Sequence, residues 1–91
     1  MNQYFINDLN ISKNIVKLRK KADMTQEYVA VQLQTMGLNI SRSRLSMIEL
    51  GRLNVPVSLL VALKIIFKCS YPEFFEGLEK MLIDGIDGIC D

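Results

Sequence analysis

This chain of 91 residues contains no histidine, no tryptophan and only two cysteines. The absence of histidine excludes histidine-based catalytic triads and removes the usual general base and most zinc ligand sets. Cys69 and Cys90 are far apart and have no second pair to complete a tetrahedral site, so we expect reduced thiols in a cytoplasmic protein. The sequence therefore predicts no metal site and no bound cofactor.

Long apolar runs are also missing. No run of about 18 uncharged apolar residues is present, which excludes a transmembrane helix, and the first residues do not have the pattern of a secretory signal. With 49% hydrophobic and 23% charged residues, the composition is that of one globular domain. We expect this domain at residues 11–83, after an N-terminal extension at 1–10 and before a flexible acidic tail at 84–91.

The small net charge of +1 conceals a division along the chain. Residues 11–52 contain eight cations against three carboxylates, a net charge of +5, whereas residues 53–91 contain three cations against six carboxylates, a net charge of −3. An uneven solvated surface is the simple explanation of such a division. The alternative is that one part of the protein meets an anion and the other part avoids one.

Apolar residues recur at helical spacing, and no segment alternates long enough to predict a strand, so we expect an all-α fold of five helices. The first begins near Ile11 and ends near Ala22 and Asp23. Thr25 and Ser41 are typical N-cap residues for the second and third helices, which Gly37 and Gly51 should end. A capping box of Ser70 and Glu73 opens the fifth helix, whose apolar side would contain Phe74, Phe75, Leu78, Met81 and Leu82.

The fourth predicted helix, at residues 57–67, is apolar nearly all round. Such a helix is either central in the bundle or has its second face covered by another subunit. For the second case we expect a homodimer whose interface contains Leu59, Ala62, Ile66, Phe75 and Leu78. The acidic C-terminal half also offers a surface to a partner protein.

Polar side chains stand at the N-terminal ends of the second and third helices: Gln26 on one, and Arg42, Ser43 and Arg44 on the other. A helix N-terminus presents free N–H groups and a positive partial charge, which suit a phosphate. Arginines at that position are unfavourable for the helix dipole unless an anion binds there. Guanidinium groups can also bind guanine bidentately, so this arrangement favours DNA as the ligand.

The order and spacing of these segments make residues 11–75 similar to the lambda-repressor-like, Cro-type helix-turn-helix domain of the XRE family. The segments that carry the resemblance are Leu18-Arg19-Lys20-Lys21, Met24-Thr25-Gln26-Glu27, Ile40 to Gly51, and Cys69 to Phe75. The resemblance implies that the third helix enters the major groove of DNA. It assigns a phosphate contact to Gln26, base contacts to Arg42, Ser43 and Met47, and contacts with the DNA backbone to Arg44, Arg52 and Asn54.

In the family, an arginine of the first helix pairs with the glutamate that ends the recognition helix, which here are Arg19 and Glu49. We expect this pair to be structural and to fix the third helix on the first. Two features depart from the family pattern. The stretch from Leu33 to Ser41 is about five residues longer than usual, so either the second helix gains a turn or the connection bulges. Met47, in place of a polar residue, can only press on a thymine methyl group or pack internally.

These features predict a sequence-specific DNA-binding transcriptional regulator, most simply a repressor that binds double-stranded DNA with an inverted repeat as a homodimer. The size also fits an antitoxin or a controller protein of a restriction–modification system. A helical interaction module that does not bind DNA is the alternative from another class. An enzyme has little support, because Glu73, Glu76 and Glu79 lie along one helix without a nucleophile or base.

Overall fold

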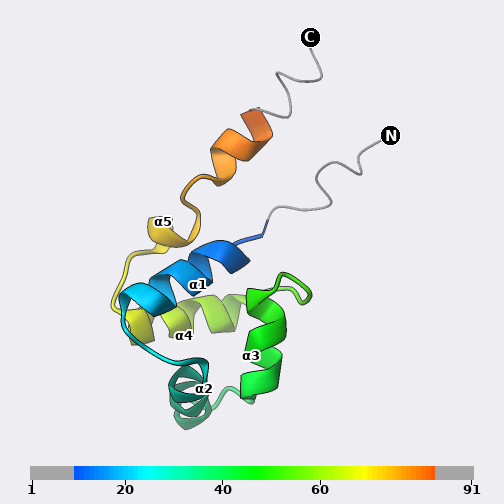
Figure 1. Cartoon of the computed structure of the whole chain (residues 1–91). Helices are drawn as coiled ribbons and strands as arrows, with labels where there is room; N and C mark the ends of the chain where they lie inside the picture. Colours follow the sequence, from blue (N-terminus) through cyan, green and yellow to red (C-terminus); the bar gives the residue numbers. More distant parts are fainter. Residues whose placement is uncertain (1–9, 84–91) are drawn as a thin grey trace.

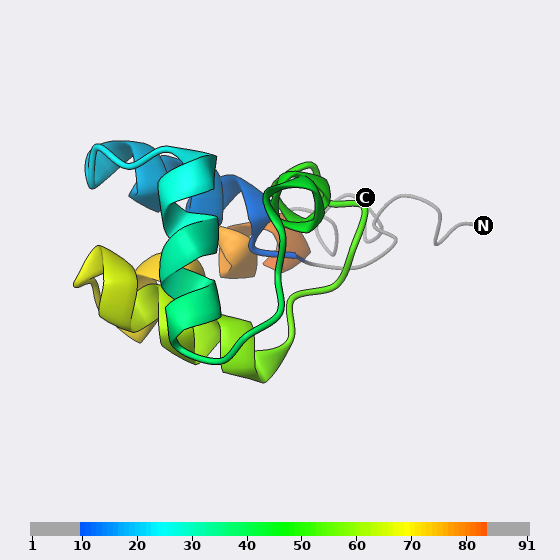
Figure 2. The same ribbon diagram turned by 90° about the horizontal axis from the view of Figure 1, so that it is seen from below.

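The computed structural model describes residues 10–83, and within this range every regular element is a helix. In chain order these are α1 (Ser12–Lys21), α2 (Gln26–Thr35), α3 (Arg42–Glu49), α4 (Val57–Phe67) and α5 (Tyr71–Phe74), and residues 78–83 form a further helical segment (Figure 1). α1 packs against α3 and α5, while α2 packs against α3 and α4 (Figure 2). The prediction of an all-α fold is confirmed. The expected tail at 84–91 and the extension, except Asn10, lie outside the described residues.

The core forms where the inner faces of these short helices meet. Each labelled helix contributes at least one completely buried side chain: Ile15 from α1, Leu33 from α2, Leu45 from α3, Leu63 from α4 and Phe74 from α5. Full burial of such a side chain stabilises the fold by roughly 1.5–3 kcal/mol. Helices of eight to eleven residues are marginal alone in water, so α1 to α4 depend on this shared core.

The helices that are expected to meet DNA begin at the predicted residues. The Thr25 hydroxyl accepts a hydrogen bond from the N–H of Tyr28 at 3.0 Å, and the Ser41 hydroxyl accepts one from the N–H of Arg44 at 3.1 Å. Both cap residues have extended backbone angles, as N-caps require. The two predicted caps are confirmed, and they set where the first turns of α2 and α3 lie.

The connection between α2 and α3 is anchored to the core. Gly37 has φ +89°, and the N–H of Leu38 donates to the carbonyl of Leu33 at 3.0 Å, which closes α2 with a Schellman motif. Leu38 and Ile40 then pack against the hydrophobic core. α2 continues to Thr35, so the long stretch between Leu33 and Ser41 consists of the last turn of α2 and a connection that is anchored by Leu38 and Ile40.

The expectation of one continuous fifth helix is wrong. The Glu73 carboxylate accepts a hydrogen bond from the Ser70 N–H at 2.7 Å, as a capping box requires, but α5 ends at Phe74 after one turn. Gly77 adopts φ +85°, a left-handed conformation that interrupts a right-handed helix. The helical segment at 78–83 therefore starts in a new direction and extends away from the helices of the core (Figure 1).

Candidate nucleic-acid interface

α3 presents one face to the core and the opposite face to the solvent. Leu45, Ile48 and Glu49 are buried, whereas Arg42, Ser43 and Arg44 in its first turn are exposed. Because residues four apart share one face of a helix, Met47 lies on the same outward side as Ser43, where it is half-buried. These four outward residues are the ones that sequence analysis assigned to DNA on this helix.

Two further residues belong to the same outward face. Ser46 lies three residues and Leu50 seven residues after Ser43, and Leu50 is 64% exposed at the C-cap of α3. The centre of this face is thus Ser43, Ser46, Met47 and Leu50, with an arginine on each side of its start. Sequence analysis missed Ser46 and Leu50, although helical spacing counted from Ser43 reaches both.

A hydrogen-bonded ion pair fixes α3 against α1. Arg19 donates from Nε to Glu49 Oε2 at 2.8 Å and from Nη2 to Glu49 Oε1 at 3.0 Å. A third bond from Arg19 Nη1 reaches the carbonyl of Met24 at 2.9 Å, in the connection that leads to α2. The guanidinium is therefore used inside the protein, and the pair sets the angle between α1, α2 and α3.

Gln26 joins the same network. Its Nε2 donates to Glu49 Oε1 at 2.9 Å, so Glu49 accepts three hydrogen bonds from two helices. The side chain of Gln26 is half-buried at the start of α2 and its orientation is set by Glu49. Sequence analysis assigned a phosphate contact to Gln26 and missed this internal bond, because the bond depends on how α2 and α3 are packed.

Arg52 and Asn54 follow α3 and are exposed. Gly51 has φ +78°, and the N–H of Arg52 donates to the carbonyl of Met47 at 3.0 Å, which ends α3 with a second Schellman motif. A Cβ at position 51 would lie 3.3 Å from Ser12 Oγ, so glycine also allows close packing on the start of α1. The turn thus holds Arg52 directly beyond the end of α3.

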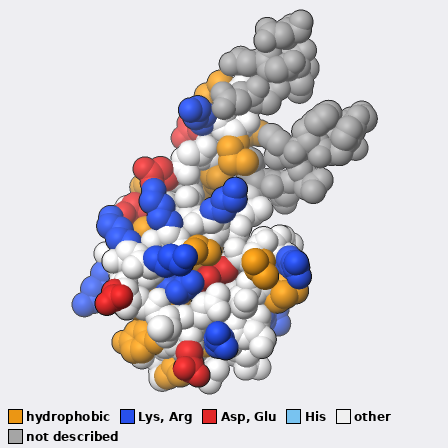
Figure 3. All heavy atoms as spheres, in the orientation of Figure 1, with side chains coloured by type: hydrophobic (Ala, Val, Ile, Leu, Met, Phe, Trp, Pro, Cys, Tyr) orange, Lys and Arg blue, Asp and Glu red, His pale blue; other side chains and the backbone are white. Residues whose placement is uncertain are grey.

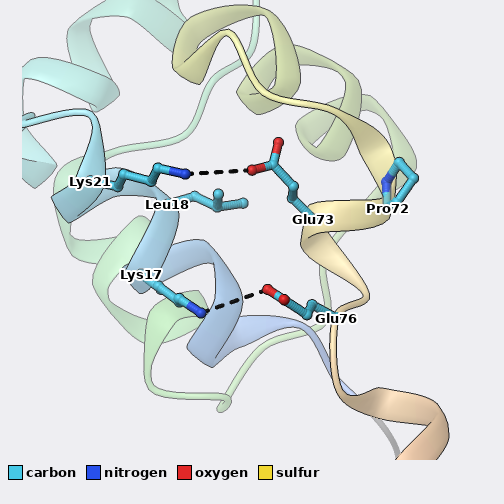
Figure 4. A pocket seen from close by; sticks show the side chains of 6 residues that line it. All are labelled: Lys17, Leu18, Lys21, Pro72, Glu73 and Glu76. Atoms are coloured by element: carbon cyan, nitrogen blue, oxygen red, sulfur yellow. Dashed lines mark ion pairs between the residues drawn. The ribbon is translucent and has the colours of Figure 1, made fainter.

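Part of the positive charge of the N-terminal half is directed away from α3. Lys17 Nζ lies 3.6 Å from Glu76 Oε1, and Lys21 Nζ lies 3.9 Å from Glu73 Oε1, across a groove of about 450 Å³ (Figure 4). Figure 3 shows basic side chains gathered over α1 with acidic ones beside them. The pKa of Glu73 lies below its usual range, mainly because its carboxylate accepts a hydrogen bond from the Ser70 N–H and a second one from the Ser70 hydroxyl. The positive charge of Lys21 also lowers this pKa. These exposed pairs join the basic and acidic parts of the chain.

The residues expected in a dimer interface do not share one surface. Leu59 and Ala62 are 0% and 3% exposed and belong to the core of a single chain, so their assignment to an outer face of α4 is wrong. The reason is that α4 is covered by other helices on this side, whereas its solvent side contains Val57, Val61 and Ile65. Ile66 and Leu78 are half-buried against the core, and Phe75 is exposed.

Two capped helices joined by a connection, with the second presenting arginine and serine outward, define a helix-turn-helix protein. A family model described as Helix-turn-helix matches residues 15–74, about two thirds of the chain. The chain belongs to this family, and is a DNA-binding regulator of the XRE type. A search of curated proteins and a search of solved structures gave no significant match. Within residues 10–83, no helix is long and apolar enough to span a membrane.

Proposed function

We propose that this protein is a cytoplasmic repressor that binds an inverted-repeat operator as a homodimer. The observation that carries the proposal is the exposed first turn of α3, where Arg42, Ser43 and Arg44 stand at a helix N-terminus. A phosphate near these side chains would relieve the unfavourable interaction between the arginines and the helix dipole. The buried Arg19–Glu49 pair supports the proposal, because it holds this helix rigidly before DNA binds.

In this proposal the first turn and the outward face of α3 have different roles. Arg44, Arg52 and Asn54 contact the DNA backbone and position the protein, whereas Arg42 and Ser43 read base edges. The apolar part of the face, at Met47 and Leu50, favours thymine methyl groups over hydrogen-bonding base edges. Gln26 binds a phosphate with its second amide hydrogen while Glu49 holds the first.

The C-terminal helical segment is the proposed dimer contact. Phe75, Met81, Leu82 and Ile83 are exposed on or just before residues 78–83, and three consecutive exposed apolar residues in a short helix favour a covering partner. Leu50, Gly51, Leu78 and Met81 line one groove of about 510 Å³, so this segment lies beside the C-terminal end of α3. A dimer formed there would turn the N-terminal ends of two α3 helices outward, toward major grooves separated by about 34 Å.

Selection of bound duplexes from a random library tests the whole proposal. A symmetric motif with half-sites one helical turn apart would support DNA binding and dimerisation together. Enrichment of an asymmetric motif would contradict the homodimer, and absence of any enriched duplex would favour an interaction module.

A matched pair of variants tests the DNA-facing surface. Replacing Arg42 and Arg44 with glutamine should weaken operator binding and lower the slope of log K against log salt by about 0.9 for each lost phosphate contact. The control replaces Lys17 and Lys21 with glutamine, which removes the same charge beside α5. Equal losses of affinity in the two double variants would contradict the assignment of α3.

A further inference from the structure

The helical segment at residues 78–83 leaves the other helices through a turn that packing does little to control. Leu78 packs against the core, but residues 79–83 are all exposed, so the segment is attached at one end. Gly77, which precedes it, has φ +85°, and no atom of a more distant residue lies within 4 Å of where its Cβ would be. A glycine in open space can adopt many backbone conformations. The direction of the segment is therefore set by contacts of the residues before it.

The Asn14 side chain makes such contacts from α1. Its Nδ2 donates one hydrogen bond to the carbonyl of Phe74 at 2.8 Å and another to the carbonyl of Glu76 at 3.0 Å. An amide nitrogen has two hydrogens, so one side chain can bond both carbonyls. The carbonyl of Glu76 belongs to the planar peptide unit that joins Glu76 to Gly77, and this unit cannot rotate without breaking the bond. Asn14 thus restrains rotation at the start of the turn.

The helix that contains Asn14 also holds α3. Arg19 binds Glu49 with two hydrogen bonds, and Gly51 lies so close to α1 that its Cβ would be 3.3 Å from Ser12 Oγ. α1 has ten residues and is about 15 Å long at 1.5 Å per residue. The connection from α3 to the C-terminal helical segment therefore runs through one short helix, with hydrogen-bonded contacts at both of its ends.

We propose that Asn14 is a positioning residue that sets the direction of residues 78–83 relative to α3, and with it the half-site spacing that the dimer accepts. The inference rests on the function proposed above, in which this segment joins two chains. One base pair inserted between half-sites moves a half-site by about 3.4 Å and turns it by about 35° around the DNA axis. With Asn14 in place, the two α3 helices cannot follow this change, whereas without it the turn at Gly77 lets them follow.

Spin labels measure the direction of the segment without DNA. Lys20→Cys on α1 and Lys80→Cys on the segment place labels at two exposed positions, in a chain with Cys69→Ala and Cys90→Ser. Dilution with unlabelled protein restricts double electron–electron resonance to distances within one chain. With Asn14 present, we expect a single narrow distribution of distances between the two labels.

Two variants of Asn14 and one matched control decide the result. Asn14→Ala removes the amide, and Asn14→Asp keeps its size but offers only oxygens to the two carbonyls, so both should broaden the distribution. A carboxylate suits the first turn of a helix, so Asn14→Asp keeps α1 stable. Lys17→Gln, the control, loses only the pair with the side chain of Glu76 and should keep the distribution narrow. A folded Asn14 variant with a distribution as narrow as that of the control would overturn the proposal.

Operators of two spacings test the role in DNA binding. The wild type should bind an operator with one inserted base pair about tenfold more weakly than the selected operator, within the usual range of coupling between sites. Asn14→Ala should lose most of this difference, and Lys17→Gln should keep it. An undiminished difference in Asn14→Ala would overturn the role in spacing. Failure of the wild type to bind any duplex would overturn the proposed function, while the label distances would still decide whether Asn14 directs the segment.

Discussion

Glu49→Ala removes the acceptor that joins three helices, and its effect can be worked from the structure. The variant leaves the Arg19 guanidinium with the carbonyl of Met24 as its remaining partner, in a side chain that is 13% exposed. Loss of one partner of a buried pair costs about 3–5 kcal/mol, because the other charge stays desolvated. Since Arg19 keeps one hydrogen bond and some contact with water, we expect Glu49→Ala to lower the free energy of unfolding by about 3 kcal/mol, at the lower end of this range.

Thermal unfolding followed by circular dichroism measures this cost. For a domain of this size, 1 kcal/mol corresponds to about 4–8 °C, so Tm should fall by roughly 15 °C. Glu76→Ala is the control, because its pair with Lys17 is 69% exposed on both sides and should contribute less than about 0.5 kcal/mol. Adding Arg19→Leu to Glu49→Ala should recover part of the loss, since no unpaired charge remains. A Tm within about 2 °C of the wild type, together with an altered operator preference, would refute the structural role of the pair.

Three further outcomes follow from the caps, the core and α5. Ser41→Ala should lower the free energy of unfolding, measured by urea denaturation, by about 1 kcal/mol, because the N-cap hydrogen bond of α3 is lost. An unchanged urea midpoint would contradict the stabilising role of this cap. Leu59→Ala should cost about 2–5 kcal/mol, and sedimentation should show unchanged association once the variant is folded. Because the pKa of Glu73 is lowered in the folded chain, its stabilising effect is present at neutral pH and is lost as pH falls through that pKa. The protection factor of the Ser70 N–H against hydrogen exchange, which is the measured rate corrected for the intrinsic pH dependence, should therefore fall in acid, and Glu73→Gln should remove this dependence.

Local signals in the sequence predicted most of the elements. The caps at Thr25 and Ser41 and the left-handed ends at Asp23 and Gly37 depend on side chains and backbone angles within a few residues, so these boundaries could be placed from the sequence. The break at Gly77 was missed. Apolar residues continue at helical spacing across it, and a periodic pattern does not reveal a change in helix direction.

The exposed arginines at the start of α3 were determined by the sequence alone, because an N-cap and a helical period of 3.6 residues fix which side chains point outward. Tertiary structure decided which side of α4 is free. Nearly all residues of that helix are apolar, so the pattern contained no polar face to indicate the solvent, and only packing against the other helices buried Leu59 and left Val61 exposed. Packing also decided that Gln26 shares Glu49 with Arg19, since Glu49 is 23 residues from Gln26 and 30 from Arg19 in the chain and meets them only when α3 packs against α1 and α2.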